Sequence, residues 1–194
     1  MKLIKAAFLS VAIAALLVEF VPLARASLQS KKQYAIIQAN SANIMTEPAI
    51  TVDDIQALNR DIEVIIAQGD VEGILQYMAP FIISETITES SVGTESVYIE
   101  GIEDHRRMLT RVFNEAETEE LSDTQEISKQ ETIRVTSDGQ LATAVISTVN
   151  EVTTDNEFRL VSTIDTIRFA RLQGEIKVIF YTTDSRITSH DLQN

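Results

Sequence analysis

The chain has 194 residues and a formal net charge of −13, with 29 acidic against 16 lysine and arginine side chains and no cysteine. An acidic surface of this kind repels the phosphate groups of nucleic acids and the anionic lipids of membranes, so neither is an expected partner. The lack of cysteine excludes disulfides, thiol catalysis, cysteine-ligated zinc and a lipid-modified cysteine anchor.

Residues 1–26 predict a cleaved secretory signal peptide. Lys2 and Lys5 form a positive start, residues 6–18 are an apolar run, and Ala24-Arg25-Ala26 fits a cleavage site. The apolar run is shorter than the roughly 20 residues that a membrane-spanning helix needs, although an uncleaved anchor is the alternative. We therefore expect a mature chain that begins at Ser27, has no membrane segment, and is periplasmic or secreted.

The rest of the chain divides into a lead-in and one domain. Residues 27–50 have no sustained apolar period and contain Ser, Asn, Gln and Pro48, which favours a loosely ordered segment. Residues 51–190 have a length that suits a single domain with its own core.

Two helices are expected at the start of this domain. Thr51 heads a capping-box pattern, apolar residues follow at helical spacing, and Gly69 is a typical stop. Asp70 can cap a second helix, which is expected to include Met78 and to end at Pro80.

A strand, a loop and a third helix follow in the sequence. Residues 81–88, "FIISETIT", are rich in β-branched side chains and predict a strand, whereas the polar residues 90–95 predict a loop and residues 97–99 a short strand. Residues 101–117 return to helical spacing, with apolar side chains on one face. The glutamates that close this helix, at 115, 117, 119 and 120, are interpreted as a solvated helix end.

From Gln125 onward the apolar period becomes that of strands. Four segments, near residues 126–136, 141–153, 157–169 and 175–187, are separated by short connections with turn-forming residues. Consecutive strands joined in this way predict an antiparallel meander. Helices first and a long sheet afterwards define an α+β fold, with three N-terminal helices packed on one face of a curved antiparallel sheet.

Four short stretches resemble the nuclear transport factor 2-like superfamily, in its SnoaL-like and ketosteroid isomerase-like branches. "AQGDVEGILQYMAP" resembles the helical entry, "GIEDHRRML" the third helix, and "IDTIRF" with "IKVIFY" the terminal hairpin of the isomerase branch. The resemblance covers about residues 51–187. It implies a cone-like sheet that often encloses an apolar pocket. The superfamily includes isomerases, cyclases, dehydratases and non-catalytic members, so the fold does not settle the function.

Asp165 stands in "IDTIRF", a run that otherwise predicts a buried strand. Side chains alternate along a strand, so Asp165 shares a face with Ile167 and Phe169. An ionised carboxylate is costly to bury there, and we expect Asp165 either to find a partner or to keep its proton through a raised pKa. The resemblance implies a protonated oxyanion-hole donor at this position. The alternative is a structural carboxylate bonded to a neighbouring strand or to an arginine.

The other catalytic roles of the isomerase branch do not carry over. The resemblance places its second oxyanion donor, a tyrosine, at Ile62 and its general base, an aspartate, at Thr86. Glu85 is adjacent, but neighbouring strand residues face opposite sides of a sheet. The residues expected to line a pocket are Ile62, Tyr77, His105, Asp165 and Tyr181.

His105 is the remaining candidate, because it lies on the apolar face of the third expected helix, with Ile102 and Leu109. One interpretation is a pocket acid or base paired with Asp165 or Glu85. The other is a buried helix histidine satisfied within the fold. No spacing of histidines and carboxylates matches a metal site, and no phosphate-loop or dinucleotide motif occurs, so neither a metal nor a cofactor is expected.

Together these features favour an exported domain that binds a small apolar or amphipathic molecule without catalysis. The first alternative is an isomerase, cyclase or dehydratase that uses Asp165 with His105 or Glu85. The second is a dimeric interaction module with a filled cone. Residues 141–153 have apolar side chains on both strand faces, which indicates that a second chain covers one face and that the protein is a homodimer.

Overall fold

The computed structural model describes residues 48–118, 123–153 and 157–191. The expected signal peptide and nearly all of the lead-in lie outside these residues. The described elements are α3 (Val52–Gln68), α4 (Val71–Gln76), β1 (Met78–Ser90), β2 (Gly93–Glu100), α5 (Ile102–Thr118), β3 (Asp123–Val135), β4 (Leu141–Thr153), β5 (Glu157–Leu172) and β6 (Glu175–Asp191). In this part of the chain, no helix is both long enough and apolar enough to cross a membrane.

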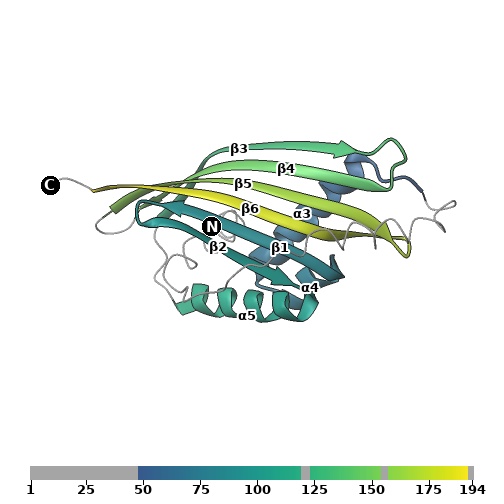
Figure 1. Cartoon of the computed structure of the whole chain (residues 1–194), viewed down its shortest axis with the longest axis horizontal. Coiled ribbons are helices and arrows are strands. Elements are labelled where there is room, and N and C mark those ends of the chain that lie inside the picture. Colours follow the sequence, from purple (N-terminus) through teal and green to yellow (C-terminus); the bar gives the residue numbers. More distant parts are fainter. Residues whose placement is uncertain (1–47, 119–122, 154–156, 192–194) are drawn as a thin grey trace.

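The strands form one curved sheet in the order β2-β1-β6-β5-β4-β3, with the helices packed against one of its sides (Figure 1). Neighbouring strands are antiparallel except β1 and β6, which run parallel. The predicted α+β fold is confirmed. It differs in one respect, because the last strand lies beside the first and makes the sheet mixed.

Helix α3 begins and ends where the sequence predicts. The Thr51 hydroxyl accepts a hydrogen bond from the Asp54 N–H, and the Asp54 carboxylate accepts one from the Thr51 N–H. Gly69 closes the helix in the left-handed conformation, at φ 71°. The lead-in ends in the core, since Ile50 is buried and its N–H donates to the Gly139 carbonyl at 2.7 Å.

The second helix is shorter than predicted. Helix α4 ends at Gln76, and both Met78 and Pro80 belong to β1. The Val178 N–H donates to the Tyr77 carbonyl at 2.7 Å, so pairing with β6 draws the chain into the sheet at this point. Pro80 has no N–H to donate, and it lies within the irregular stretch of the β1–β6 pair where a proline is tolerated.

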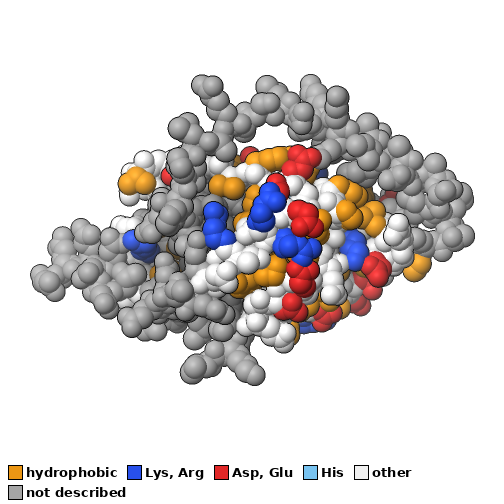
Figure 2. Space-filling model, turned by 90° about the horizontal axis from the view of Figure 1, so that it is seen from below, with side chains coloured by type: hydrophobic (Ala, Val, Ile, Leu, Met, Phe, Trp, Pro, Cys, Tyr) orange, Lys and Arg blue, Asp and Glu red, His pale blue; other side chains and the backbone are white. Residues whose placement is uncertain are grey.

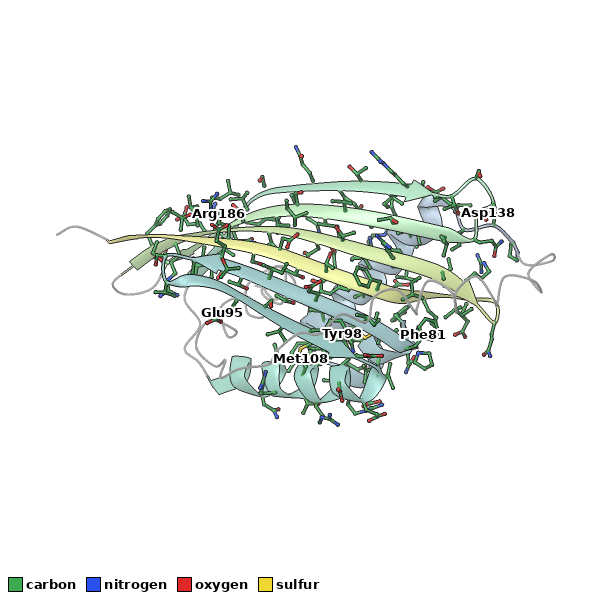
Figure 3. The ribbon with its side chains drawn as sticks, viewed as in Figure 1. Phe81, Glu95, Tyr98, Met108, Asp138 and Arg186 are labelled. Atoms are coloured by element: carbon green, nitrogen blue, oxygen red, sulfur yellow. The ribbon has the colours of Figure 1, made fainter. Side chains whose placement is uncertain are left out.

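The predicted loop over residues 90–95 is wrong, because this stretch is a β-hairpin. Strand β1 continues to Ser90 and β2 begins at Gly93, and these two residues face each other across the pair. The turn at Asp138 joins β3 to β4 as predicted (Figure 3).

The main apolar core lies between α3 and one end of the sheet. Its fully buried side chains include Ile55, Ile82 and Phe169. A second cluster joins α4 to α5, where Met108 lies between α5 and the sheet (Figure 3). The outer surface of α5 carries arginines next to carboxylates (Figure 2). The apolar core thus covers only part of the helix-facing side of the sheet.

Candidate functional site

Asp165 lies on the buried face of β5, as the alternation predicts. Thr163, Asp165 and Phe169 are all buried, whereas Ser162 and Ile164 on the other face are exposed. The sheet therefore presents the Asp165 carboxylate to the interior of the domain.

The carboxylate is held by hydroxyl groups of the neighbouring strand. Asp165 Oδ1 accepts hydrogen bonds from the Tyr181 and Thr183 hydroxyls, each at 2.7 Å. Thr183 is directly opposite Asp165 in the β5–β6 pair, and Tyr181 is one step further along the same face of β6. Asp165 therefore has hydrogen-bond partners inside the fold.

His105 joins α5 to β1. Its Nδ1 lies 2.7 Å from the Gly101 carbonyl oxygen and its Nε2 lies 2.9 Å from the Ser84 hydroxyl. The carbonyl can only accept, so Nδ1 donates and, in the neutral ring, Nε2 accepts from Ser84. Burial of the ring lowers the pKa of His105. Both ring nitrogens are engaged in these contacts, and neither partner is Asp165 or Glu85.

Glu85 is on the other side of the sheet. It lies opposite Tyr98 on β2 and opposite Thr182 on β6. Its neighbours Ser84 and Thr86 face the helices, because Ser84 reaches His105. Adjacent strand residues point to opposite faces, so the sheet itself separates Glu85 from Asp165 and His105.

The remaining expected pocket residues divide into two groups. Ile62 and Tyr77 are half-buried and pack against the main core cluster. Tyr181 instead bonds to Asp165. The structure thus brings Tyr181 and Asp165 together and leaves Ile62, Tyr77 and His105 in structural contacts.

Asp165 is part of a larger set of small polar side chains on the helix-facing side of the sheet, which we call the polar band. The band crosses four adjacent strands, and the cross-strand register brings its members side by side. Its members are Thr86, Thr88, Thr148, Asn150, Thr163, Asp165, Thr183 and Ser185. The main core lies at one end of the band, and a small apolar cluster around Val152 and Val161 lies at the other.

Much of the polar band has no hydrogen-bond partner among residues 48–118, 123–153 and 157–191. The hydroxyls of Thr88, Thr148, Thr163 and Ser185 and both polar atoms of Asn150 are buried and unpaired. Asn150 and Thr163 are each 1% exposed, so bulk water does not reach them. Folded proteins leave few buried polar atoms unpaired, because each costs about 1–3 kcal/mol. The part of the chain that the structure describes therefore leaves an unusual number of buried polar atoms unpaired in one place.

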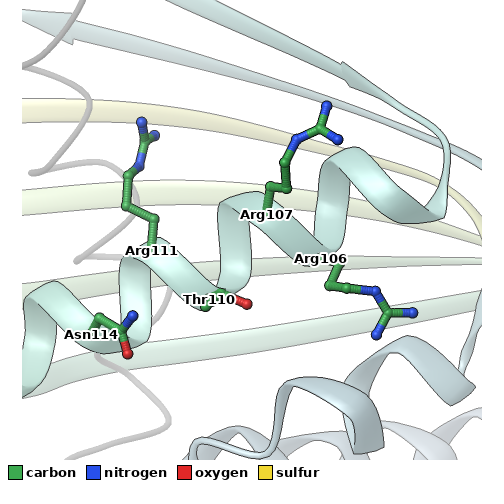
Figure 4. Close-up of a pocket in the computed structure, with 5 residues that line it drawn as sticks. All are labelled: Arg106, Arg107, Thr110, Arg111 and Asn114. Carbon is green, nitrogen blue, oxygen red and sulfur yellow. The ribbon is translucent and has the colours of Figure 1, made fainter.

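A shallow hollow on the outer surface of α5 is a weaker candidate (Figure 4). Arg106, Arg107 and Arg111 line it, with Thr110 and Asn114. Arg106 pairs with Glu72 and Glu103, and Arg107 pairs with Asp104. The hollow contains none of the predicted site residues, and carboxylates beside it offset its positive charge.

Sequence reasoning found Asp165 and Tyr181 but missed the rest of the band. The signal was available in "SETIT", "STVN", "STID" and "TTDS", where small polar residues recur every second position on one strand face. Such alternation ordinarily marks the solvent side of a strand. These residues are recognised as buried only when they are seen to lie on the same face of the sheet as Asp165.

Comparison with known structures assigns the fold, which is an α+β domain with helices covering one side of a curved mixed sheet. An NTF2-like protein of unknown function from Pseudomonas putida KT2440 matches with a TM-score of 0.50 and 14% identity, over 68% of this chain and 84% of that one. The beta subunit of benzoate 1,2-dioxygenase from Burkholderia mallei matches with a TM-score of 0.49 and 13% identity, over 71% and 92%. The CaMKII hub of S. rosetta matches with a TM-score of 0.47 and 12% identity, over 71% and 98%.

The chain therefore has the nuclear transport factor 2-like fold, as its motifs predict. No family model matches the sequence, and no curated protein does. Likeness at this level of identity shows the fold alone, so the function has to be argued from the residues of the site.

Proposed function

We propose that this protein binds a small amphipathic molecule against the polar band and holds it without chemical change. The observation that carries the proposal is the group of buried polar atoms without partners, above all the Thr163 hydroxyl and the Asn150 amide. The band lies between two apolar clusters, an arrangement that suits a molecule with both polar and apolar parts.

The positions of the candidate acids and bases support binding without turnover. Asp165 is fixed by two hydroxyl donors, and His105 uses both ring nitrogens in contacts that hold α5 to the sheet. Glu85 lies on the opposite face. A proton-transfer mechanism needs an acid and a base that reach the same substrate, and these three side chains do not form such a set.

The direct test is to identify what the protein carries. The full sequence is expressed in a bacterial host, the protein is purified without detergent, and native mass spectrometry is run before and after denaturation. We expect a mass excess that corresponds to a bound small molecule and disappears on denaturation. An apo mass alone, together with no binding in a screen of amphipathic compounds, would contradict the proposal.

A matched pair of substitutions tests the role of the band. Thr163 and Thr183 are each 1% exposed, but the Thr163 hydroxyl is unpaired whereas the Thr183 hydroxyl donates to Asp165. In the ligand-free protein we expect Thr163→Val to raise the free energy of unfolding by about 0.5–2 kcal/mol and Thr183→Val to lower it by about 1–2 kcal/mol. Urea unfolding measures both. If Thr163→Val destabilises as much as Thr183→Val, the hydroxyl serves the fold and not a ligand.

Export is the second part of the proposal, and it rests on residues 1–26. We expect the protein recovered from the periplasm or medium to begin at Ser27, because Ala24-Arg25-Ala26 fits a signal-peptidase site. Intact-mass measurement of the recovered protein shows which residue it begins with. A mass that retains residues 1–26 would favour an anchored form.

Self-association is the third part of the proposal. On the outer face of the sheet Ile164 is 49% exposed, and Leu141 is 37% exposed on the neighbouring strand. We propose that a second copy covers this face, because exposed apolar side chains on a broad sheet are stabilised by burial. Light scattering is expected to give a dimer mass, and Ile164→Glu to give a monomer. A monomeric parent protein at tens of micromolar would argue against pairing.

A further inference from the structure

We infer that the ligand held by the polar band has an uncharged head group with several hydroxyls, as in a glycoside or another polyol linked to an apolar part. The inference rests on the proposed function, because it concerns the same site. It follows from which hydrogen-bonding groups are unpaired, and from the charges beside them.

The unpaired groups of the band need partners that both donate and accept. Each hydroxyl of Thr88, Thr163 and Ser185 can give one hydrogen bond and receive others. The Asn150 amide can donate through Nδ2 and accept through Oδ1, and neither atom has a partner among the described residues. A sulfate or carboxylate can only accept and an ammonium can only donate, so either would leave part of the set unpaired. A hydroxyl group does both.

The charges near the band disfavour an anionic head. Asp165 is a member of the band, and Glu95 lies directly opposite Thr88 with a buried, unpaired Oε2. Lys129 on β3 lies opposite Thr148, the band member on β4, but its ammonium contacts the Glu63 carboxylate at 2.6 Å. An anion bound here would lose its hydration next to carboxylates, which costs several kcal/mol. The acidic chain, at −13, adds long-range repulsion.

The apolar part of the ligand has neighbours at either end of the band. Val152 and Val161, with Ile187 beside them, form the small cluster next to Asn150. The main core cluster begins beyond Asp165, at Ile167 and Phe169. A molecule with a hydroxylated head and an alkyl or ring portion can form hydrogen bonds with the polar band and, at the same time, contact one of these apolar clusters.

Three probes that share one alkyl chain test the inference: octyl glucoside, octyl sulfate and octyltrimethylammonium. Binding to the full mature protein is measured by calorimetry below the micelle concentration of each. We expect octyl glucoside to bind at least about tenfold more tightly than the other two, since one or two added hydrogen bonds contribute this much. Asn150→Leu should reduce glucoside affinity about tenfold and leave sulfate affinity unchanged. Thr166→Val, on the outer face opposite Val145 and Thr182, is the control and should change neither.

The possible outcomes distinguish a failure of the head-group inference from a failure of the proposed function. Equal binding of all three probes, or tighter binding of the sulfate, would overturn the neutral polyhydroxyl head and leave a small-molecule site in place. Tighter binding of the trimethylammonium probe would show that negative charge alone selects the ligand, which also overturns the inference. Binding of none of the probes would contradict both the head-group inference and the proposed function.

Discussion

Replacing Asp165 with leucine is expected to lower the free energy of unfolding by about 2–5 kcal/mol, while replacement with asparagine costs much less. Leucine removes the acceptor of the Tyr181 and Thr183 hydroxyls, and each buried group left unpaired costs about 1–3 kcal/mol. Asparagine keeps an oxygen at the Oδ1 position that can accept from both. Urea denaturation followed by circular dichroism measures the two variants against the parent protein.

A double-mutant cycle distinguishes this cause from simple loss of packing. Thr183→Val should lower the free energy of unfolding by about 1–2 kcal/mol in the parent protein and raise it by about 0.5–2 kcal/mol in the Asp165→Leu background, because there the hydroxyl is already unpaired, like that of Thr163. Tyr181→Phe should cost less in the Asp165→Leu background than in the parent protein. Equal costs in both backgrounds, or an Asp165→Leu variant as stable as the parent, would mean that these hydrogen bonds do not stabilise the β5–β6 pair.

Acidification is expected to destabilise the fold through His105 before the carboxylates titrate. Burial lowers the pKa of His105 below its unfolded value of 6.5, so the unfolded chain binds the proton more readily. The stabilisation from the neutral ring is therefore complete above about pH 6.5 and is lost as the pH falls from there toward the folded pKa. Between these two values the slope approaches about 1.4 kcal/mol per pH unit. Urea unfolding at several pH values between 5 and 8 measures how the free energy of unfolding changes with pH.

A substitution of the same ring tests this assignment. His105→Gln should flatten the pH dependence of stability that the parent protein shows between pH 5 and 6.5. Glutamine can still donate to the Gly101 carbonyl or accept from Ser84, and it does not titrate. A pH dependence that survives His105→Gln would assign the effect to other groups.

Local rules predicted the parts of the fold that depend on near neighbours. The Thr51 capping box, the Gly69 stop and the buried face of β5 each follow from a few adjacent residues, and the structure shows all three. The end of α4 did not follow, because helical spacing continues through Met78 while the chain is held by Val178, a hundred residues later. The spacing of apolar residues within a short stretch cannot predict a contact with a residue a hundred positions further along the chain.

The candidate site was predicted in part for the same reason. Asp165 was identified because a carboxylate in an apolar strand is unusual, and Tyr181 because a tyrosine can bring a hydroxyl into a pocket. The Ser84 partner of His105 and the position of Asn150 depend on the register between strands. Register is set by the assembled sheet, so no local pattern distinguishes these residues from a solvent-facing row.

The place of β6 in the sheet has a consequence for how the chain is made. Strand β6 is the last strand in the sequence, yet it lies between β1 and β5 and alone connects the β1–β2 hairpin to the β3–β5 meander. Until β6 has left the ribosome, the two parts have no shared strand, and the contacts that close the domain span about a hundred residues. Completion of the sheet must therefore wait until β6 has been synthesised. Until that strand is available, the β1–β2 hairpin and the β3–β5 meander each keep an unpaired strand edge.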